Sequence, residues 1–232
     1  MKDDWHDRAY AETWDSNPLR KNPLREEHLD ILVSIIIDGY REGASILDLG
    51  MGSGQVEEMI FQRVPNARVV GIDASEVMIE MAAKRLKDHR DRYSVIRHDL
   101  RELGTLDLAS NSFQYAISSQ VFHELPHEKK REAFAFVQRV LAPGGVFLIA
   151  DRTALDVGSL YEVYASVWSR LIRKVSRASG GFPEFLKWYD TKEDFPATPQ
   201  EHVDFLKEAG FEAACLHLHL NRGLFAAEKR GS

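Results

Sequence analysis

Hydrophobic residues fall into short runs that alternate with segments of helical periodicity. The runs are bounded by turn-forming residues and predict buried strands at residues 45–50, 67–73, 93–99, 113–119 and 145–151. Between them, apolar side chains recur at intervals of three and four and predict helices at residues 54–64, 75–89 and 128–141. Pro143 should end the last of these helices. Strands that alternate with helices predict an α/β fold whose parallel sheet is covered on both faces.

The end of the chain departs from this alternation. Residues 211–220 and 224–229 read as two strands joined by the tight turn Asn221-Arg222-Gly223. The pattern therefore predicts a doubly wound, seven-stranded sheet, mostly parallel, with a C-terminal antiparallel hairpin. We expect a single domain over residues 1–232, with an N-terminal helical arm (1–43), a ligand-binding core (44–151), a helical lid insert (152–197) and a C-terminal helix with the hairpin (198–232).

The composition of the chain mainly excludes certain partners, targeting segments and metal or disulfide motifs. The 232 residues are 44% hydrophobic, which allows a sizeable core, and the net charge of −6 argues against DNA as a partner. Residues 1–14 are acidic where a secretory signal would be basic and then apolar, and the longest aliphatic run, 31–37, is too short to span a bilayer. The lone Cys215 has no partner for a disulfide or a zinc motif. We therefore expect a cytoplasmic protein without a membrane segment.

A glycine-rich turn follows the first predicted strand, where open α/β sheets bind their ligands. Gly50, Gly52 and Gly54 alternate with Met51 and Ser53. Glycine lets the backbone approach a ligand closely and tolerates positive φ angles. The spacing differs from that of a nicotinamide-binding loop, and the Gly-Lys-Ser/Thr of a Walker loop is missing. Both pyrophosphate interpretations are therefore disfavoured.

Acidic residues at the ends of strands indicate a different ligand. Asp73 follows the glycine turn at about the spacing at which a carboxylate accepts ribose hydroxyls, and Asp99 is placed to accept from an adenine amino group. Asp48 lies within the turn motif itself. Carboxylates in this crevice would repel phosphates and attract an ammonium or sulfonium group. The ligand is therefore expected to be cationic and nucleoside-like.

These motifs resemble the class I methyltransferases that use S-adenosylmethionine, which have a Rossmann-like fold. LDLGMGSG resembles the glycine loop, VVGIDAS the ribose strand and RHDLREL the adenine strand, while FQYAISSQVFHEL and LAPGGVFLIADR resemble the next two strand motifs. The resemblance implies S-adenosylmethionine as cofactor, S-adenosylhomocysteine as product, and a cofactor site comprising Asp48, Gly50, Gly52, Gly54, Asp73, Ala74, Met78, Asp99, Leu100, Ser118 and Gln120.

Several of these residues also have a purely structural interpretation. Asp73 precedes a predicted helix and could be its N-cap, and Met78 could simply fill the core. His123 follows the fourth strand, where the methyl group should be presented, and is our candidate catalytic base, with packing as the alternative. His217 and His219 share one side of a strand, but without a third ligand they are interpreted as exposed histidines, and no metal is predicted.

Aromatic residues concentrate outside the shared core. The arm contains Trp5, Tyr10 and Trp14, and the insert contains eight rings, including Trp188 and Tyr189. An aromatic lid would exclude water and shape a pocket, so Trp14, Trp188 and Tyr189 are predicted to contact the acceptor or the cofactor. Packing between helices is the alternative interpretation.

The predicted function is transfer of a methyl group to an oxygen, nitrogen or carbon of a small molecule. RNA is disfavoured as acceptor, because the basic stripe Arg170 to Arg177 reads as a solvated helix face. An RNA or protein methyltransferase, and a protein of the same fold that only binds or modifies the cofactor, remain the alternatives. The sequence is compatible with a homodimer but does not determine the oligomeric state.

Overall fold

The computed structural model describes residues 4–16, 22, 25–154, 158–160, 162–163, 166–167, 170, 194–219 and 221–231. Its α-helices are α1 (Arg8–Ser16), α2 (Arg25–Gly39), α3 (Gln55–Arg63), α4 (Glu76–Arg85), α5 (His127–Val140) and α8 (Pro199–Glu208). Its strands are β1 (Ser45–Leu49), β2 (Arg68–Asp73), β3 (Tyr93–Arg97), β4 (Phe113–Ser119), β5 (Leu141–Arg152), β6 (Phe211–His219) and β7 (Arg222–Lys229). Short 3-10 helices are η2 (Lys87–His89), η3 (Leu100–Thr105), η4 (Phe122–Glu124) and η5 (Gly158–Leu160).

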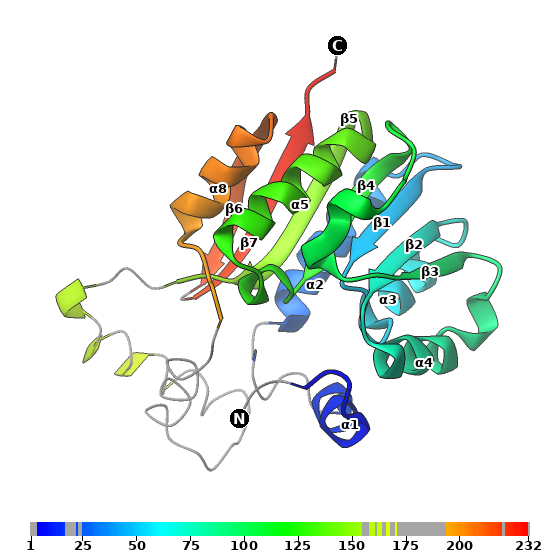
Figure 1. Cartoon of the computed structure of the whole chain (residues 1–232), viewed down its shortest axis with the longest axis horizontal. Helices are drawn as coiled ribbons and strands as arrows, with labels where there is room; N and C mark the ends of the chain where they lie inside the picture. Colours follow the sequence, from blue (N-terminus) through cyan, green and yellow to red (C-terminus); the bar gives the residue numbers. More distant parts are fainter. Residues whose placement is uncertain are drawn as a thin grey trace.

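The strands form one seven-stranded sheet in the order β3-β2-β1-β4-β5-β7-β6 (Figure 1). β1 to β5 pair in parallel, whereas β7 runs antiparallel to both β5 and β6. This confirms the predicted doubly wound sheet with its C-terminal hairpin. The reversal between β1 and β4 is the point at which such sheets bind ligands at their carboxyl edge.

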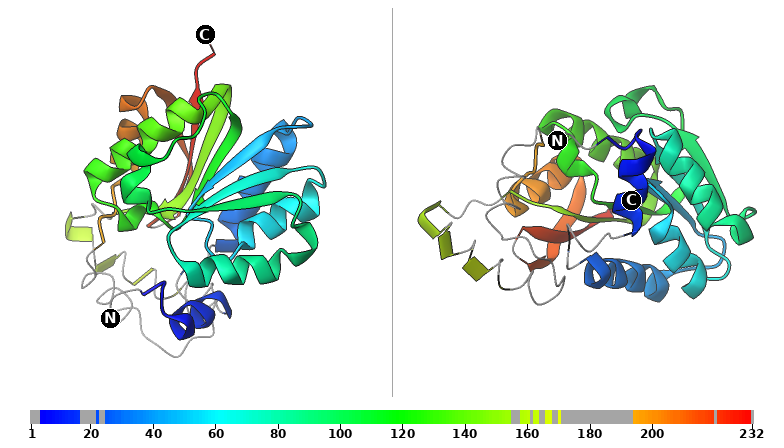
Figure 2. Two further views of the ribbon diagram at one scale, coloured as in Figure 1. Left: turned by 45° about the vertical axis from the view of Figure 1, so that its right-hand side comes forward. Right: turned by 90° about the horizontal axis from the view of Figure 1, so that it is seen from below.

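Helices cover both faces of the sheet, and alternate strand residues supply each core. On one face, Ile46 and Leu148 pack with apolar residues of α2, α3 and α4. On the other, Leu47 and Phe147 pack with α5, α8 and η3. This period-two alternation places successive side chains of one strand in opposite cores. Figure 2 shows the sheet between the two layers.

The boundary between α5 and β5 differs from the prediction. The helix ends at Val140 and the strand begins at Leu141, whereas we expected the strand to start at Gly145. The register of β5 against β4 shifts between the Phe113–Leu141 and Tyr115–Val146 pairs, and Gly144 in this irregularity has a φ of 73°. Pro143 therefore lies in a bulged strand rather than after a longer helix.

The last helix begins with a capping box, and the first helix of the arm packs beside α4. Thr198 and Glu201 form a capping box at the start of α8, with Pro199 at its first turn. α1 lies beside α4, to which it is joined by the ion pairs Arg8–Glu80 and Asp15–Arg85 (Figure 1). Among helices in the described ranges, none combines the length and apolar character needed to cross a bilayer. The predicted helical insert falls mostly outside the described residues.

Candidate functional site

The glycine loop has the backbone conformation that its composition predicted. Gly50, Gly52 and Gly54 have φ angles of 80°, 58° and 79°. The N–H groups of Gly50 and Met51 both donate to the carbonyl oxygen of Ile72, at 2.8 and 3.1 Å, so the loop is held against β2. A Cβ at Gly50 would collide with Val121, whereas one at Gly52 would have no neighbour closer than 4.0 Å. Gly50 is therefore required by packing, and Gly52 leaves an open approach to the backbone.

Asp73 joins the end of β2 to the glycine loop. Its Oδ2 accepts a hydrogen bond from the Gly52 N–H at 2.8 Å, and its Oδ1 accepts from the Ser75 N–H at 2.8 Å. Burial raises the pKa of Asp73, although these two N–H donors oppose the change. The N-cap of α4 is Ser75, whose Oγ accepts from Met78 N, so the capping interpretation of Asp73 was wrong. A carboxylate accepts about four hydrogen bonds, which leaves capacity for hydroxyl donors.

Asp48 forms a buried pair with Glu57 of α3 beneath the loop. Their exposed fractions are 2% and 0%, and no hydrogen-bond donor from the described residues reaches Asp48 Oδ1 or either Glu57 oxygen. Burial raises the pKa of each carboxyl, and for Asp48 the neighbouring Glu57 adds to the rise. The pair therefore holds a proton to higher pH than an exposed carboxyl. The sequence interpretation placed Asp48 in the crevice and missed Glu57.

Replacing Glu57 by Gln should stabilise the protein at neutral pH. Because its folded-state pKa is raised, wild-type stability falls as pH rises above the unfolded value of about 4.5, and glutamine removes this loss. We expect a gain of roughly 1 kcal/mol near pH 7 that disappears near pH 4, measured by urea unfolding. Glu58→Gln is the control, because Glu58 is partly exposed and bonds Arg85. Equal unfolding midpoints for wild type and Glu57→Gln at both pH values would contradict the prediction.

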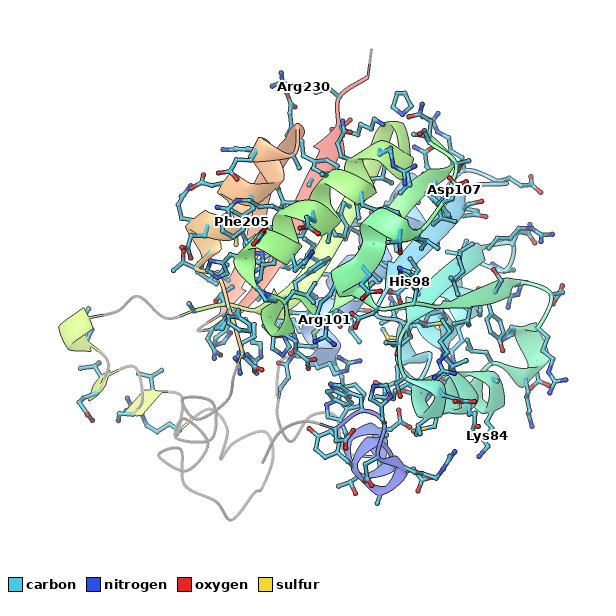
Figure 3. The ribbon with its side chains drawn as sticks, viewed as in Figure 1. Lys84, His98, Arg101, Asp107, Phe205 and Arg230 are labelled. Atoms are coloured by element: carbon cyan, nitrogen blue, oxygen red, sulfur yellow. The ribbon has the colours of Figure 1, made fainter. Side chains whose placement is uncertain are left out.

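Asp99 follows β3, as predicted, but its carboxylate is already engaged. Its Oδ1 accepts from the Arg101 N–H at 2.9 Å, which caps η3, and Oδ2 pairs with the Arg101 guanidinium at 3.0 Å. Figure 3 labels Arg101 and His98 in this region. Burial opposes ionisation, but the hydrogen bonds from Arg101 lower the pKa of Asp99. Leu100 and Met78 are both buried in the hydrophobic core.

The end of β4 contains Ser118 and Gln120 in unlike settings. The hydroxyl of Ser118 is buried and donates to the carbonyl oxygen of Leu49 at 2.8 Å, so it links β4 to β1. Gln120 has a φ of 61°, which is uncommon for a residue with a side chain. Its backbone N–H donates to the carbonyl oxygen of Ala150 at 2.8 Å, which holds this turn against β5. Ala74 is half-buried beside Asp73.

His123 and Asp151 form a buried dyad at the carboxyl ends of β4 and β5. His123 Nδ1 lies 2.6 Å from Asp151 Oδ1, and the His123 backbone N–H donates to Asp151 Oδ2 at 2.8 Å. Asp151 is fully buried and the His123 side chain is 9% exposed. Burial favours the neutral acid, but the adjacent imidazole lowers the pKa of Asp151. Asp151 was missed, although it lies at the carboxyl end of its strand as Asp73 does.

Two further basic residues, Lys130 and His202, pack near the dyad. The Lys130 ammonium group donates to the carbonyl oxygens of Leu125 and Phe195, and burial lowers its pKa to about 8. His202 is fully buried against the Phe225 ring, and burial lowers its pKa to about 4. Because His202 is neutral at pH 7, it packs beside the Asp151 carboxylate without pairing with it.

The arm crosses the carboxyl edge of the sheet. The Trp5 carbonyl oxygen accepts from Ser75 Oγ at 2.6 Å, and Trp5 Nε1 donates to Glu124 Oε1 at 3.0 Å. Trp5 also contacts Trp14 edge-on, with ring centroids 5.4 Å apart. The arm thus spans from the start of α4 to η4. Trp188 and Tyr189 lie outside the described residues, as does most of the Arg170 to Arg177 stripe.

The interpretation of His217 as an exposed strand histidine was wrong. Its Nδ1 lies 3.0 Å from His28 Nε2, and its Nε2 lies 3.6 Å from Glu27. Burial and the neighbouring His217 lower the pKa of His28 to about 4, so His28 is neutral at pH 7. In the part of the chain that the structure describes, no group of three potential metal ligands is assembled.

Known methyltransferases resemble the chain in sequence and fold. A family model described as a methyltransferase domain matches residues 46–145. A demethylmenaquinone methyltransferase from Thermotoga maritima is 26% identical over 187 residues, covering 79% of this chain and 76% of the relative. A trans-aconitate 2-methyltransferase from Rhodopseudomonas palustris is 28% identical over 194 residues, covering 81% and 67%.

An O-methyltransferase family protein from Burkholderia thailandensis superposes with a TM-score of 0.70 at 15% identity, covering 98% of this chain and 61% of that structure. At this identity the likeness shows the fold alone. The family match, however, includes the glycine loop and both strand-end carboxylates, Asp73 and Asp99. Together with the strand order of the sheet, these matches place the chain among the class I S-adenosylmethionine-dependent methyltransferases.

Proposed function

We propose that the protein methylates an O–H or N–H group of a small molecule and that His123 accepts the acceptor's proton. The observation that carries this proposal is the 2.6 Å contact between His123 Nδ1 and the fully buried Asp151 carboxylate. A histidine oriented by a carboxylate is suited to general base catalysis.

The cofactor of this family fits the residues at the glycine loop. S-adenosylmethionine supplies a methyl group on a positive sulfur, which activates that methyl for displacement. The open approach at Gly52 admits a ligand close to the backbone, and the free capacity of Asp73 suits ribose hydroxyls. Asp48 Oδ1, buried without a donor among the described residues, suits the cofactor's ammonium group. Ala74, Met78, Asp99 and Leu100 would frame the adenosine.

The dyad controls where the proton lies on His123. A carboxylate beside Nδ1 keeps the proton there, which leaves the Nε2 lone pair available as base. No hydrogen bond from a described residue reaches Nε2. When Nε2 takes the acceptor's proton, the Asp151 charge stabilises the imidazolium that forms. Alignment and exclusion of water supply the rest of the rate enhancement.

A small acceptor fits the covered mouth of the crevice. Trp5 is bonded to Ser75 on one side and Glu124 on the other, so the arm encloses the carboxyl edge instead of leaving an open groove. The two curated relatives are named for demethylmenaquinone and trans-aconitate, both small molecules. Trp14, Trp188 and Tyr189 remain proposed contacts with the acceptor.

The test is a metabolite-extract screen with methyl-labelled S-adenosylmethionine, run with wild type and with His123→Ala. We expect label in a small molecule with wild type and a much weaker signal with the variant. Label in transfer RNA or protein would overturn the small-molecule proposal. Consumption of the cofactor without any methylated product would instead support an enzyme that modifies the cofactor.

A further inference from the structure

A buried arginine lies between the glycine-loop helix and the end of β4. Arg25 begins α2 and is only 6% exposed. Its Nη1 donates to Ser119 Oγ at 3.3 Å, and its Nε and Nη2 donate to Gln55 Oε1 at 3.3 and 3.1 Å. Trp14 of α1 covers the guanidinium, with 5.0 Å between Cζ and the ring centroid. The side chain therefore reaches the carboxyl edge of the sheet, where ligands bind.

All the hydrogen-bond acceptors of this guanidinium are neutral. In the described part of the chain, no ion pair involves Arg25. The nearby Asp15 is held by the Arg85 guanidinium at 2.6 Å, by the Ser53 hydroxyl and by the Gln55 amide at 2.7 Å. The Gln55 side chain thus lies between the Arg25 guanidinium and the Asp15 carboxylate. Burial lowers the pKa of Arg25 to about 10, so the side chain is still charged at pH 7.

Asp15 and Asp48 act on the Arg25 guanidinium only through space, and a buried charge without a directly paired partner is stabilised by a bound anion. Arg25 also lines a hollow of 640 Å³ between α2 and α3. Five carboxylates border this hollow against three arginines, so its net charge disfavours an anion; the acids are Asp15, Glu26, Glu27, Asp30 and Glu58. On its other side Arg25 faces Ser119, beside the glycine loop. The first turn of α3 adds N–H groups there that also favour negative charge.

We propose that Arg25 binds the α-carboxylate of the methionine end of S-adenosylmethionine. The guanidinium fork matches a carboxylate, and Asp48 would take the ammonium group on the same carbon. The helical arm thereby contributes to cofactor binding through Arg25, with Trp14 covering the ion pair from solvent. The assignment requires only the cofactor of the family, so its test needs no acceptor.

The experiment measures the Kd of Arg25→Met and wild type for S-adenosylmethionine and for decarboxylated S-adenosylmethionine, which lacks only the carboxylate. We expect the variant to lose roughly 10-fold in affinity for the intact cofactor and to bind the decarboxylated one as wild type does. Arg25→Lys retains the charge but not the two-pronged guanidinium group. Its affinity for S-adenosylmethionine should lie between those of wild type and Arg25→Met. Arg63→Met is the matched control, because Arg63 lines the same hollow but pairs with Asp30.

Thermal unfolding of the ligand-free proteins separates binding from a structural contribution. We expect Arg25→Met to unfold at the wild-type temperature or above it, because an unpaired buried charge is removed, and to be stabilised less by S-adenosylmethionine. Equal losses of affinity for S-adenosylmethionine and its decarboxylated form would overturn the assignment. A lower unfolding temperature without a selective loss of affinity for the intact cofactor would also overturn it. Unchanged cofactor binding with a raised KM for an acceptor would instead assign Arg25 to an anionic acceptor.

Discussion

Replacing His123 by Ala is expected to lower kcat by roughly 10²- to 10⁴-fold while the Kd for S-adenosylmethionine stays nearly unchanged. The imidazole belongs to the proposed proton-transfer step, whereas the glycine loop and Asp73 are separate from it. The measurement pairs turnover of an identified acceptor with calorimetric titration of the cofactor.

Two further variants test the dyad itself. Asp151→Asn should also lower kcat, because an amide no longer favours the Nδ1–H tautomer of His123 or its imidazolium form. His127→Ala is the control, because His127 packs against Phe205 at the start of α5 and not against Asp151. Wild-type kcat in His123→Ala, with the fold intact, would show that alignment alone drives the reaction and that His123 serves packing.

Replacing Asp73 by Ala is expected to weaken cofactor binding by about 1 to 3 kcal/mol, which is roughly 5- to 150-fold in Kd. The variant loses the proposed acceptor for the ribose hydroxyls and also leaves the Gly52 and Ser75 N–H groups without their carboxylate. The loop that receives the ligand is then held less firmly. Calorimetric titration with S-adenosylhomocysteine measures this loss directly.

Glu76→Ala is the matched control for Asp73→Ala. Glu76 lies three residues away, but its carboxylate is exposed and pairs with Arg97 at the surface, so cofactor binding should not change. Thermal unfolding establishes that each variant is folded at the titration temperature. A folded Asp73→Ala protein with wild-type affinity would show that Asp73 only organises the loop.

Local patterns in the sequence were sufficient to predict the sheet, the glycine turn and the acidic residues at the strand ends. Strand runs, helical periodicity and the turn at Gly50, Gly52 and Gly54 report burial and backbone conformation, which neighbouring residues largely determine. Strand-end residues such as Asp73 and Asp99 could be located because all parallel strands present their carboxyl ends at one edge. The break between α5 and β5 was misplaced because pairing of Leu141 with Phe113, not local propensity, decides it.

Only the tertiary structure decided which partners these residues have. Asp151 orients His123 from 28 residues away, and Arg25 reaches Ser119 across 94 positions of the chain. His28 meets His217 across 189 positions. Pairings of this kind leave no periodic signal, because they depend on how helices pack on the sheet and not on the spacing within one element. The sequence by itself therefore determined the fold and the kind of ligand, while packing determined which charges are paired, buried or left for a ligand to complete.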